Sequence, residues 1–203
     1  MKIRIATIQV KGLTPYSQSR AFQSEKKKDE DHETFDERSW PEHMHVNEDG
    51  EVFIPPVAIM QGMAAAASYL GKGGNLAKKG ASTWAQNFTC GLAIAEGPSI
   101  GIKASAASKV KVGAPSGGIK CEKVYSNADG RRGSGKRVWR RFPMFDSWTA
   151  TLVIHILDET IPKEIFEKVL DAFALFIGMG RFRPENGGYL GRFLILKLVI
   201  TDA

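Results

Sequence analysis

The chain has 203 residues, of which 43% are hydrophobic and 25% are charged, and its formal net charge is +6 at pH 7. A chain of this length can bury a complete core, so we expect one domain over 1–203, and its positive charge predicts an anionic partner. Two cysteines, Cys90 and Cys121, exclude a disulfide framework, and no apolar run reaches the roughly 20 residues of a membrane helix, so we expect a cytoplasmic protein with no membrane partner.

The first third of the chain predicts a strand, an irregular connection and a helix. Residues 3–10, "IRIATIQV", are rich in β-branched side chains and predict a strand. The stretch 14–51 carries both signs of charge and little apolar surface to bury, which predicts a mobile loop. A Glu-Asp-Gly turn near its end favours a hairpin that leads into a helix, which begins at Pro55 and Pro56 and ends before Gly71.

The last third of the chain predicts a strand, a helix and a strand. Residues 147–157, "SWTATLVIHIL", alternate between apolar and polar side chains, as a strand with one buried face does. Apolar residues at helical spacing follow, with Pro162 in the first turn and Gly178 at the end. The last apolar run, "FLILKLVIT", predicts the closing strand.

This order of elements predicts an α+β protein with a ferredoxin-like (RRM-like) βαββαβ core, in which two helices cover one face of an antiparallel sheet. We assign the core to 1–13, 52–70 and 147–203, and we interpret 71–146 as a large basic insertion in which the number of strands stays open. Many unrelated activities share this fold, so the function has to be inferred from the loops and the insertion.

A glycine-rich loop, "GMGRFRPENGGYLGRF" at 178–193, joins the second helix to the last strand. Glycine permits positive φ and removes side chains that would keep a ligand away from the backbone, so exposed N–H groups beside arginines would form a seat for phosphate. The alternative is a tight turn whose arginines only cover sheet edges. The candidate phosphate-binding residues here are Gly180, Arg181, Arg183, Gly187, Gly188 and Arg192.

A basic tract at 103–141 holds eleven lysines and arginines against two acidic residues, so the remainder of the chain has a net charge of −3. Such a local excess is typical of proteins that bind a polyanion, and Tyr125 and Trp139 within the tract and Phe142 next to it could stack on bases. The alternative is a solvated loop whose aromatic residues belong to the core. The candidate ligands of nucleic acid are Lys109, Lys111, Arg131, Arg132, Lys136, Arg137, Arg140 and Arg141.

Shorter motifs add one candidate group and exclude others. The loop after the first strand, "TPYSQSR", offers Tyr16, Ser19 and Arg20 for phosphate contacts. The stretch "GRRGSGKR" nearly matches the phosphate-binding loop of nucleotide hydrolases, but Arg137 stands where a magnesium-binding Ser or Thr is required, so we reject that interpretation. The "HMH" pair, His43 and His45, lacks further ligands, so we predict no metal site and no cofactor.

The stretch "IGMGRFRPENGGYLGRF" and the ferredoxin-like core resemble the RAMP superfamily of CRISPR-associated proteins. The resemblance covers 1–13 and 147–201, and the basic insertion is similar in character to the web and thumb elements with which backbone subunits of CRISPR effector complexes bind guide RNA. It implies that Arg181, Arg183 and Arg192 face nucleic acid, that copies associate head-to-tail into a filament or ring, and that other CRISPR effector subunits are partners in antiviral defence. The chain is short for such a subunit, which favours a stand-alone phage or mobile-element relative.

We therefore expect a non-catalytic protein that binds single-stranded RNA or DNA, with RNA favoured. Two alternatives stay open. One is a RAMP-like, metal-independent endoribonuclease in which His155 or His45 is the general base. The other is a mobile-element protein that mimics a CRISPR subunit and binds a protein partner.

Overall fold

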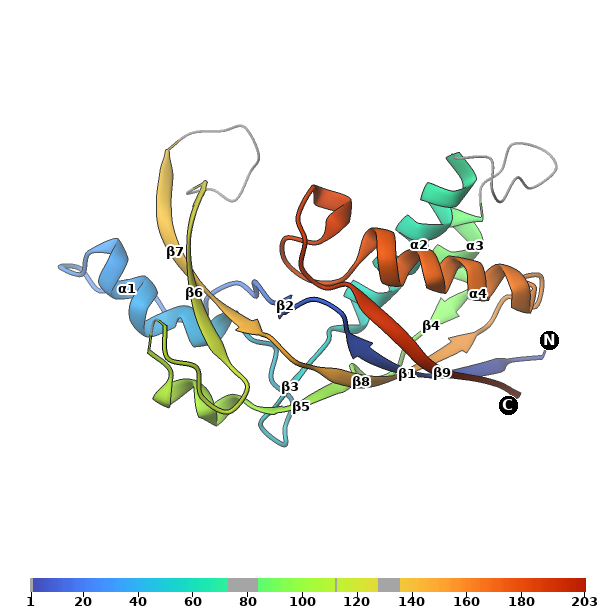
Figure 1. The fold of residues 1–203 in the computed structure, drawn as a ribbon, viewed down its shortest axis with the longest axis horizontal. Helices are drawn as coiled ribbons and strands as arrows, with labels where there is room; N and C mark the ends of the chain where they lie inside the picture. The colour runs from blue at the N-terminus through green and yellow to red at the C-terminus, as the bar shows by residue number, and fades with distance from the viewer. Residues whose placement is uncertain (1, 73–83, 112, 128–135) are drawn as a thin grey trace.

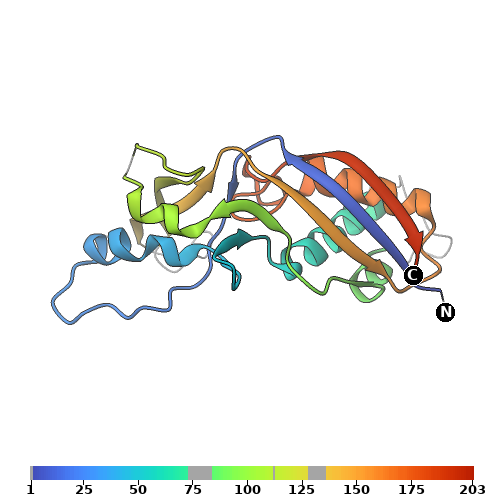
Figure 2. The same cartoon turned by 90° about the horizontal axis from the view of Figure 1, so that it is seen from below.

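A four-stranded antiparallel sheet forms the centre of the computed structural model, which describes residues 2–72, 84–111, 113–127 and 136–203. Its strand order is β4-β8-β1-β9, and two helices cover one face (Figures 1 and 2). The elements are β1 (Arg4–Gly12), α2 (Pro56–Lys72), β4 (Leu92–Ala93), β8 (Thr149–Ile156), α4 (Lys163–Ala172) and β9 (Phe193–Asp202). This arrangement confirms the predicted ferredoxin-like α+β fold.

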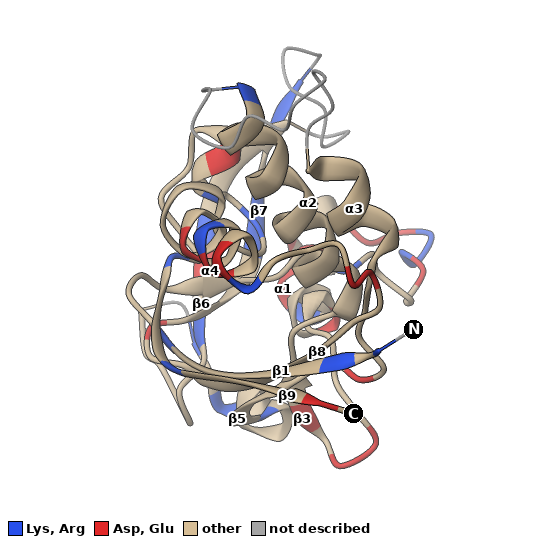
Figure 3. Cartoon of the chain, turned by 90° about the vertical axis from the view of Figure 1, so that its right-hand side faces the viewer, with Lys and Arg blue, Asp and Glu red and all other residues tan. Residues whose placement is uncertain are grey.

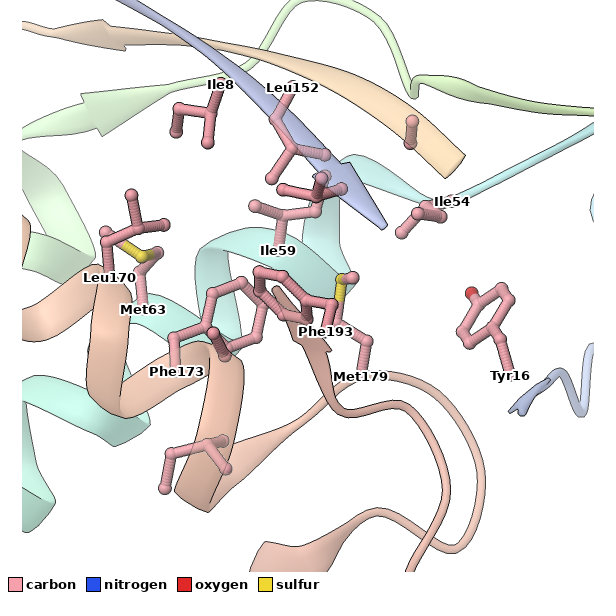
Figure 4. Packing of buried hydrophobic residues seen from close by; sticks show 14 of the residues in the cluster. Ile8, Tyr16, Ile54, Ile59, Met63, Leu152, Leu170, Phe173, Met179 and Phe193 are labelled. Carbon is pink, nitrogen blue, oxygen red and sulfur yellow. The ribbon is translucent and has the colours of Figure 1, made fainter. Parts of the chain in front are cut away.

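The core lies between the sheet and the two helices because alternate residues of β1 and β8 point toward the helices. Ile8 of β1 and Leu152 of β8 are register partners and are both fully buried, whereas Gln9, the next residue after Ile8 in β1, faces the open side of the sheet. From the helices, Met63 of α2 and Leu170 of α4 meet this apolar layer (Figure 4). The predicted alternation of these strands is therefore confirmed.

The second helix changes geometry before it reaches the glycine-rich loop. After α4 the chain continues as a π-helix, η3 (Phe173–Ile177), in which Phe173 and Ile177 are buried while Phe176 is half exposed. Gly178 ends η3 with a φ of 71°, a conformation that favours glycine. The π-helical turn therefore sets the direction in which the loop leaves the helix.

The segment 14–51, for which its charge predicted a mobile loop, contains regular secondary structure. It contains β2 (Tyr16–Ser17), α1 (His32–Ser39), the 3-10 helix η1 (Trp40–His43), and the start of β3 (Glu51–Phe53). The Asp31 carboxylate accepts the amide hydrogens of Glu33 and Thr34 and so caps α1. Trp40 is buried against the rest of the molecule. The charge pattern of the sequence did not indicate this helix, because capping and a few buried residues stabilise it rather than a continuous apolar face.

The segment 71–146 supplies one core strand and a long hairpin. Besides β4 it contains α3 (Ala85–Cys90), β5 (Ser99–Lys103), the 3-10 helix η2 (Ala104–Lys109), β6 (Lys120–Asn127) and β7 (Arg137–Phe145). Strands β3 and β5 pair with each other, and β2, β7 and β6 form a three-stranded sheet. The β6–β7 hairpin extends away from the central sheet (Figure 1). In the described parts of the chain, no helix combines the length and apolar character needed to cross a bilayer.

Candidate nucleic-acid interface

The glycine-rich loop, residues 178–192, is tied to the connection between β1 and β2 through its backbone. The Arg181 amide donates to the Ser17 carbonyl at 2.9 Å, and the Gly191 amide donates to the Pro15 carbonyl at 2.7 Å. Within the loop, the Met179 amide donates to the Gly191 carbonyl at 3.0 Å. These hydrogen bonds place Arg181 next to the three-stranded sheet that contains β7.

The glycines of the loop have structural roles, and two of the amides expected to bind phosphate are paired within the loop. A Cβ at Gly180 would overlap the Ser17 carbonyl oxygen and the Tyr16 ring. The amides of Gly187 and Gly188 donate to the carbonyls of Pro184 and Arg183, at 2.8 and 3.1 Å, around the short 3-10 helix η4 (Pro184–Asn186). These two amides are therefore already paired inside the loop.

Arg181 connects the glycine-rich loop to the β6–β7 hairpin. Its guanidinium carbon lies 3.6 Å from the centre of the Phe142 ring of β7, within the range of a cation–π interaction. Burial lowers the pKa of Arg181 to about 10, and the nearby negative charge of Glu122 on β6 partly opposes this shift. The arginine thus stays charged at neutral pH. The two cationic segments singled out from the sequence are side by side in the structure.

The neighbours of Arg181 in the loop include exposed aromatic side chains. Phe182 adopts a φ of 58°, unusual for a residue with a side chain, and its ring is 52% exposed. Tyr189 is 57% exposed and contacts Phe182 edge-on, with ring centres 6.5 Å apart. Backbone strain that keeps an aromatic ring in solvent is typical of a ligand-binding position.

The register of the hairpin divides its side chains between two faces, because directly paired residues of a sheet share a face. Phe142 contacts Arg181, so the face that carries Phe142 is the one beside the glycine-rich loop. Lys and Arg segments recur along β7 (Figure 3). The loop-facing pairs are Glu122 with Phe142 and Val124 with Arg140, and the pairs on the outer face are Lys123 with Arg141, Tyr125 with Trp139 and Asn127 with Arg137.

The outer face of the hairpin presents an aromatic pair beside cations. The rings of Tyr125 and Trp139 lie 5.2 Å apart, and each residue is 54% exposed. The Lys123 ammonium lies 5.4 Å from the centre of the Trp139 ring. Arg137 is exposed on the same face and forms no ion pair within the described residues. This face could stack on a base and contact a phosphate.

Two predicted ligands of nucleic acid are buried, which corrects their assignment. Arg141 is 6% exposed, and its guanidinium lies 3.4 Å from Glu37 and 3.8 Å from Asp36, both on α1. Tyr16 is 1% exposed, burial raises its pKa, and its hydroxyl accepts a hydrogen bond from Gln18. Neither side chain can reach a phosphate without leaving the core.

Helix α1 neutralises part of the basic tract. Besides the contacts of Asp36 and Glu37 with Arg141, Glu33 lies 2.6 Å from the Lys123 ammonium. Asp36 also accepts the backbone N–H of Arg141 at 2.6 Å, so α1 contacts the main chain of β7 as well as its side chain. Lys123 lowers the pKa of Glu33 by hydrogen bonding and by its charge. Fewer cations of the basic tract are therefore available to a polyanion than its net charge suggests.

The remaining candidates occupy different places. Arg183 forms an ion pair with Glu185 at 2.6 Å, and Arg192 donates from Nε to the Leu175 carbonyl at 3.0 Å. Ser19 is exposed and Arg20 half-buried just after β2. Lys109 and Lys111 are exposed at the end of η2, at the base of the hairpin and away from the glycine-rich loop (Figure 1). Lys136 is exposed just before β7, and Arg131 and Arg132 lie outside the described residues.

The sequence did not identify His43 as a buried residue that packs beneath this surface. His43 is 4% exposed and stacks on Phe142 with ring centres 4.7 Å apart, and the tilted ring of Phe22 lies 4.3 Å away. Its Nδ1 lies 2.6 Å from the Arg20 carbonyl, while Nε2 has no partner among the described residues. Burial lowers the pKa of His43, and the charges of Arg140 and Arg181 lower it further. The described residues contain no group of three His, Cys, Asp or Glu side chains that could hold a metal ion.

The histidines of the endoribonuclease alternative lie elsewhere. His155 is a register partner of Ile5 near the end of β8, on the open face of the sheet. The hairpin joins the opposite end of β8. His45 is half-buried against Phe53, with ring centres 5.8 Å apart. His155 is therefore separated from the hairpin by the length of β8.

Comparison with known proteins identifies a structural relative. No family model and no curated protein matches the sequence. Among solved structures, a similar chain occurs in the cryo-EM structure of the Type III-B Cmr-beta bound to cognate target RNA, with a TM-score of 0.52 and 12% sequence identity. The likeness shows a shared fold. The match covers 99% of this chain and 61% of that chain, so this protein spans less than two thirds of its structural relative.

The buried imidazole predicts a specific loss of stability in acid. Burial lowers the pKa of His43 in the folded state, whereas the unfolded chain takes up the proton below a pH of about 6.5, so stability falls as pH drops through that range. His43→Phe should reduce the loss between about pH 7.5 and 5.5, by up to about 1.4 kcal/mol for each pH unit. Urea unfolding at both pH values measures this. The exposed His32, changed to Gln, is the control, and an unchanged pH dependence in His43→Phe would contradict the assignment.

Proposed function

We propose that this protein binds single-stranded RNA without cleaving it, on the surface where the glycine-rich loop meets the β6–β7 hairpin. The observation that carries the proposal is the contact of the Arg181 guanidinium with the Phe142 ring at 3.6 Å. It joins two cationic segments that are far apart in the sequence into one surface. A chain of phosphates crossing that surface would contact both segments.

On the loop side, charge and exposed aromatic rings occur together. Arg181 and Arg140 both influence the pKa of His43, so both cations lie near the same buried imidazole. Phe182 and Tyr189 are exposed beside them. Because a base has an apolar face and its phosphate is anionic, this combination suits a nucleotide better than it suits an inorganic anion.

On the outer face of the hairpin, Tyr125 and Trp139 provide a second place for bases, and the exposed Arg137 lies on the same face. Stacking on such rings requires bases that are not already stacked in a duplex, which supports a single strand as the ligand. The basic side chains stand on strands and loops, and in the described structure no helix presents them to a groove.

The structural relative supports RNA as the ligand, because that chain belongs to a complex solved with target RNA. Following the RAMP resemblance, we extend the proposal to head-to-tail assembly along the strand and to association with CRISPR effector subunits in the cytoplasm.

The absence of catalysis is also part of the proposal. It is supported by the separation of His155 from the hairpin, and incubation with labelled RNA tests it: cleavage without metal that is lost in His155→Ala or His45→Ala would establish the endoribonuclease instead.

Removing the charge of Arg181 should weaken RNA binding and its dependence on salt. If Arg181 neutralises one phosphate, the slope of log K against log salt should become shallower by about 0.7 in Arg181→Ala. Titration of a labelled single-stranded RNA at several salt concentrations measures the slope. Lys163→Ala, which removes one exposed cation from α4, should leave the slope unchanged. An unaltered slope in Arg181→Ala would overturn the proposed surface.

Loss of the Trp139 ring should lower the affinity for RNA by removing a stacking interaction rather than a charge. Base–aromatic stacking contributes about 1–3 kcal/mol, so Trp139→Ala should weaken binding by roughly 5- to 150-fold while the salt slope stays the same. Trp139→Phe keeps a ring and should retain most of the affinity. The ring is half exposed, so neither variant should lose the fold. Equal losses in the two variants, or no loss in either, would argue against stacking at this position.

A further inference from the structure

One edge of the central sheet has no partner strand within the described chain. β9 pairs with β1 on one side only and stands at the end of the order β4-β8-β1-β9 (Figure 1). At the other edge, β4 pairs with Ile156 and His155 of β8. Along the outer side of β9, main-chain N–H and C=O groups point away from the sheet and can form a further antiparallel ladder.

The side chains of β9 do not protect this edge. Natural edge strands are commonly short or carry several charges or proline, whereas β9 has ten residues and Lys197 is its single charge before Asp202. On the open face Leu194, Leu196 and Val199 are 43%, 59% and 40% exposed. A register shift opposite Gln9 and Val10 interrupts the N-terminal half, and 197–202 pairs regularly with β1. The regular half is available for pairing.

We propose that a second copy of this chain pairs with β9 in an antiparallel manner about a two-fold axis, joining the two four-stranded sheets into one. The occupant must be a strand, because only a strand satisfies a row of outward main-chain groups. The side chains of β9 are compatible with its own copy. Lys197, Val199 and Thr201 share the open face, being register partners of Gln9, Thr7 and Ile5.

Pairing centred on Val199 places Val199 opposite Val199 of the second copy and Lys197 opposite Thr201 of the second copy. No like charges then face each other, and the two Val199 side chains meet across the axis on the open face. Such an isologous contact closes at a dimer, unlike a head-to-tail contact, which continues into a ring or filament. The inference uses only β9 and does not depend on RNA binding.

Sedimentation velocity of the full chain, freed of nucleic acid by nuclease and high salt, tests the proposal. The wild type should be a dimer whose dissociation constant rises at least about tenfold in Val199→Lys and in Val199→Glu, because like charges then face each other across the axis. An equal mixture of the two variants should restore the dimer, which also shows that both variants fold. Val153→Lys places the same charge on the same face of β8 and should leave the dimer intact.

Three outcomes would overturn the proposal. They are a wild type that is monomeric up to about 100 µM, an assembly larger than a dimer, and Val199 variants that dimerise as the wild type does. Failure of the mixed Val199→Lys and Val199→Glu variants to dimerise would equally contradict symmetric pairing along β9.

Discussion

The contact between Arg181 and Phe142 is the interaction on which the proposed RNA surface depends. The Phe142 ring contacts the guanidinium of Arg181 at 3.6 Å and the imidazole of His43 at 4.7 Å, so a buried stack links the glycine-rich loop, β7 and η1. A second tie is the hydrogen bond from the Arg181 amide to Ser17, since β2 pairs with β7. With two such ties, the loop and the hairpin keep one relative position, and binding RNA need not order them first.

Charge on this molecule is divided between structure and surface. Arg141 and Lys123 form ion pairs with acidic side chains of α1, and Arg183 forms one with Glu185. These contacts fasten α1 along β7 and keep the glycine-rich loop compact, which positions the cations that remain outside. A basic segment therefore contributes to RNA binding through the particular side chains that the fold leaves at the surface, rather than through its total charge.

The ferredoxin-like core could be predicted because its strands and helices bury regular faces, as Ile8 and Leu152 do in β1 and β8. The number of strands in 71–146 stayed open because β4 has only two residues, which make no pattern. Helix α1 was not predicted because its buried residues, Asp36 and Ser39, are polar. The glycine-rich loop was located correctly, but a sequence cannot tell whether an amide is already paired, as that of Gly188 is. Burial of Arg141 likewise depends on a helix about a hundred positions away, so no local pattern in the sequence could indicate it.

Photocrosslinking to single-stranded RNA that contains 4-thiouridine tests the central claim most directly, because it maps the residues that one strand touches. The account predicts that one RNA crosslinks both to the glycine-rich loop, at Phe182 or Tyr189, and to the hairpin, at Tyr125 or Trp139. Crosslinks confined to the open face of the central sheet, around Thr151 and Val153, or to only one of the two segments, would contradict it.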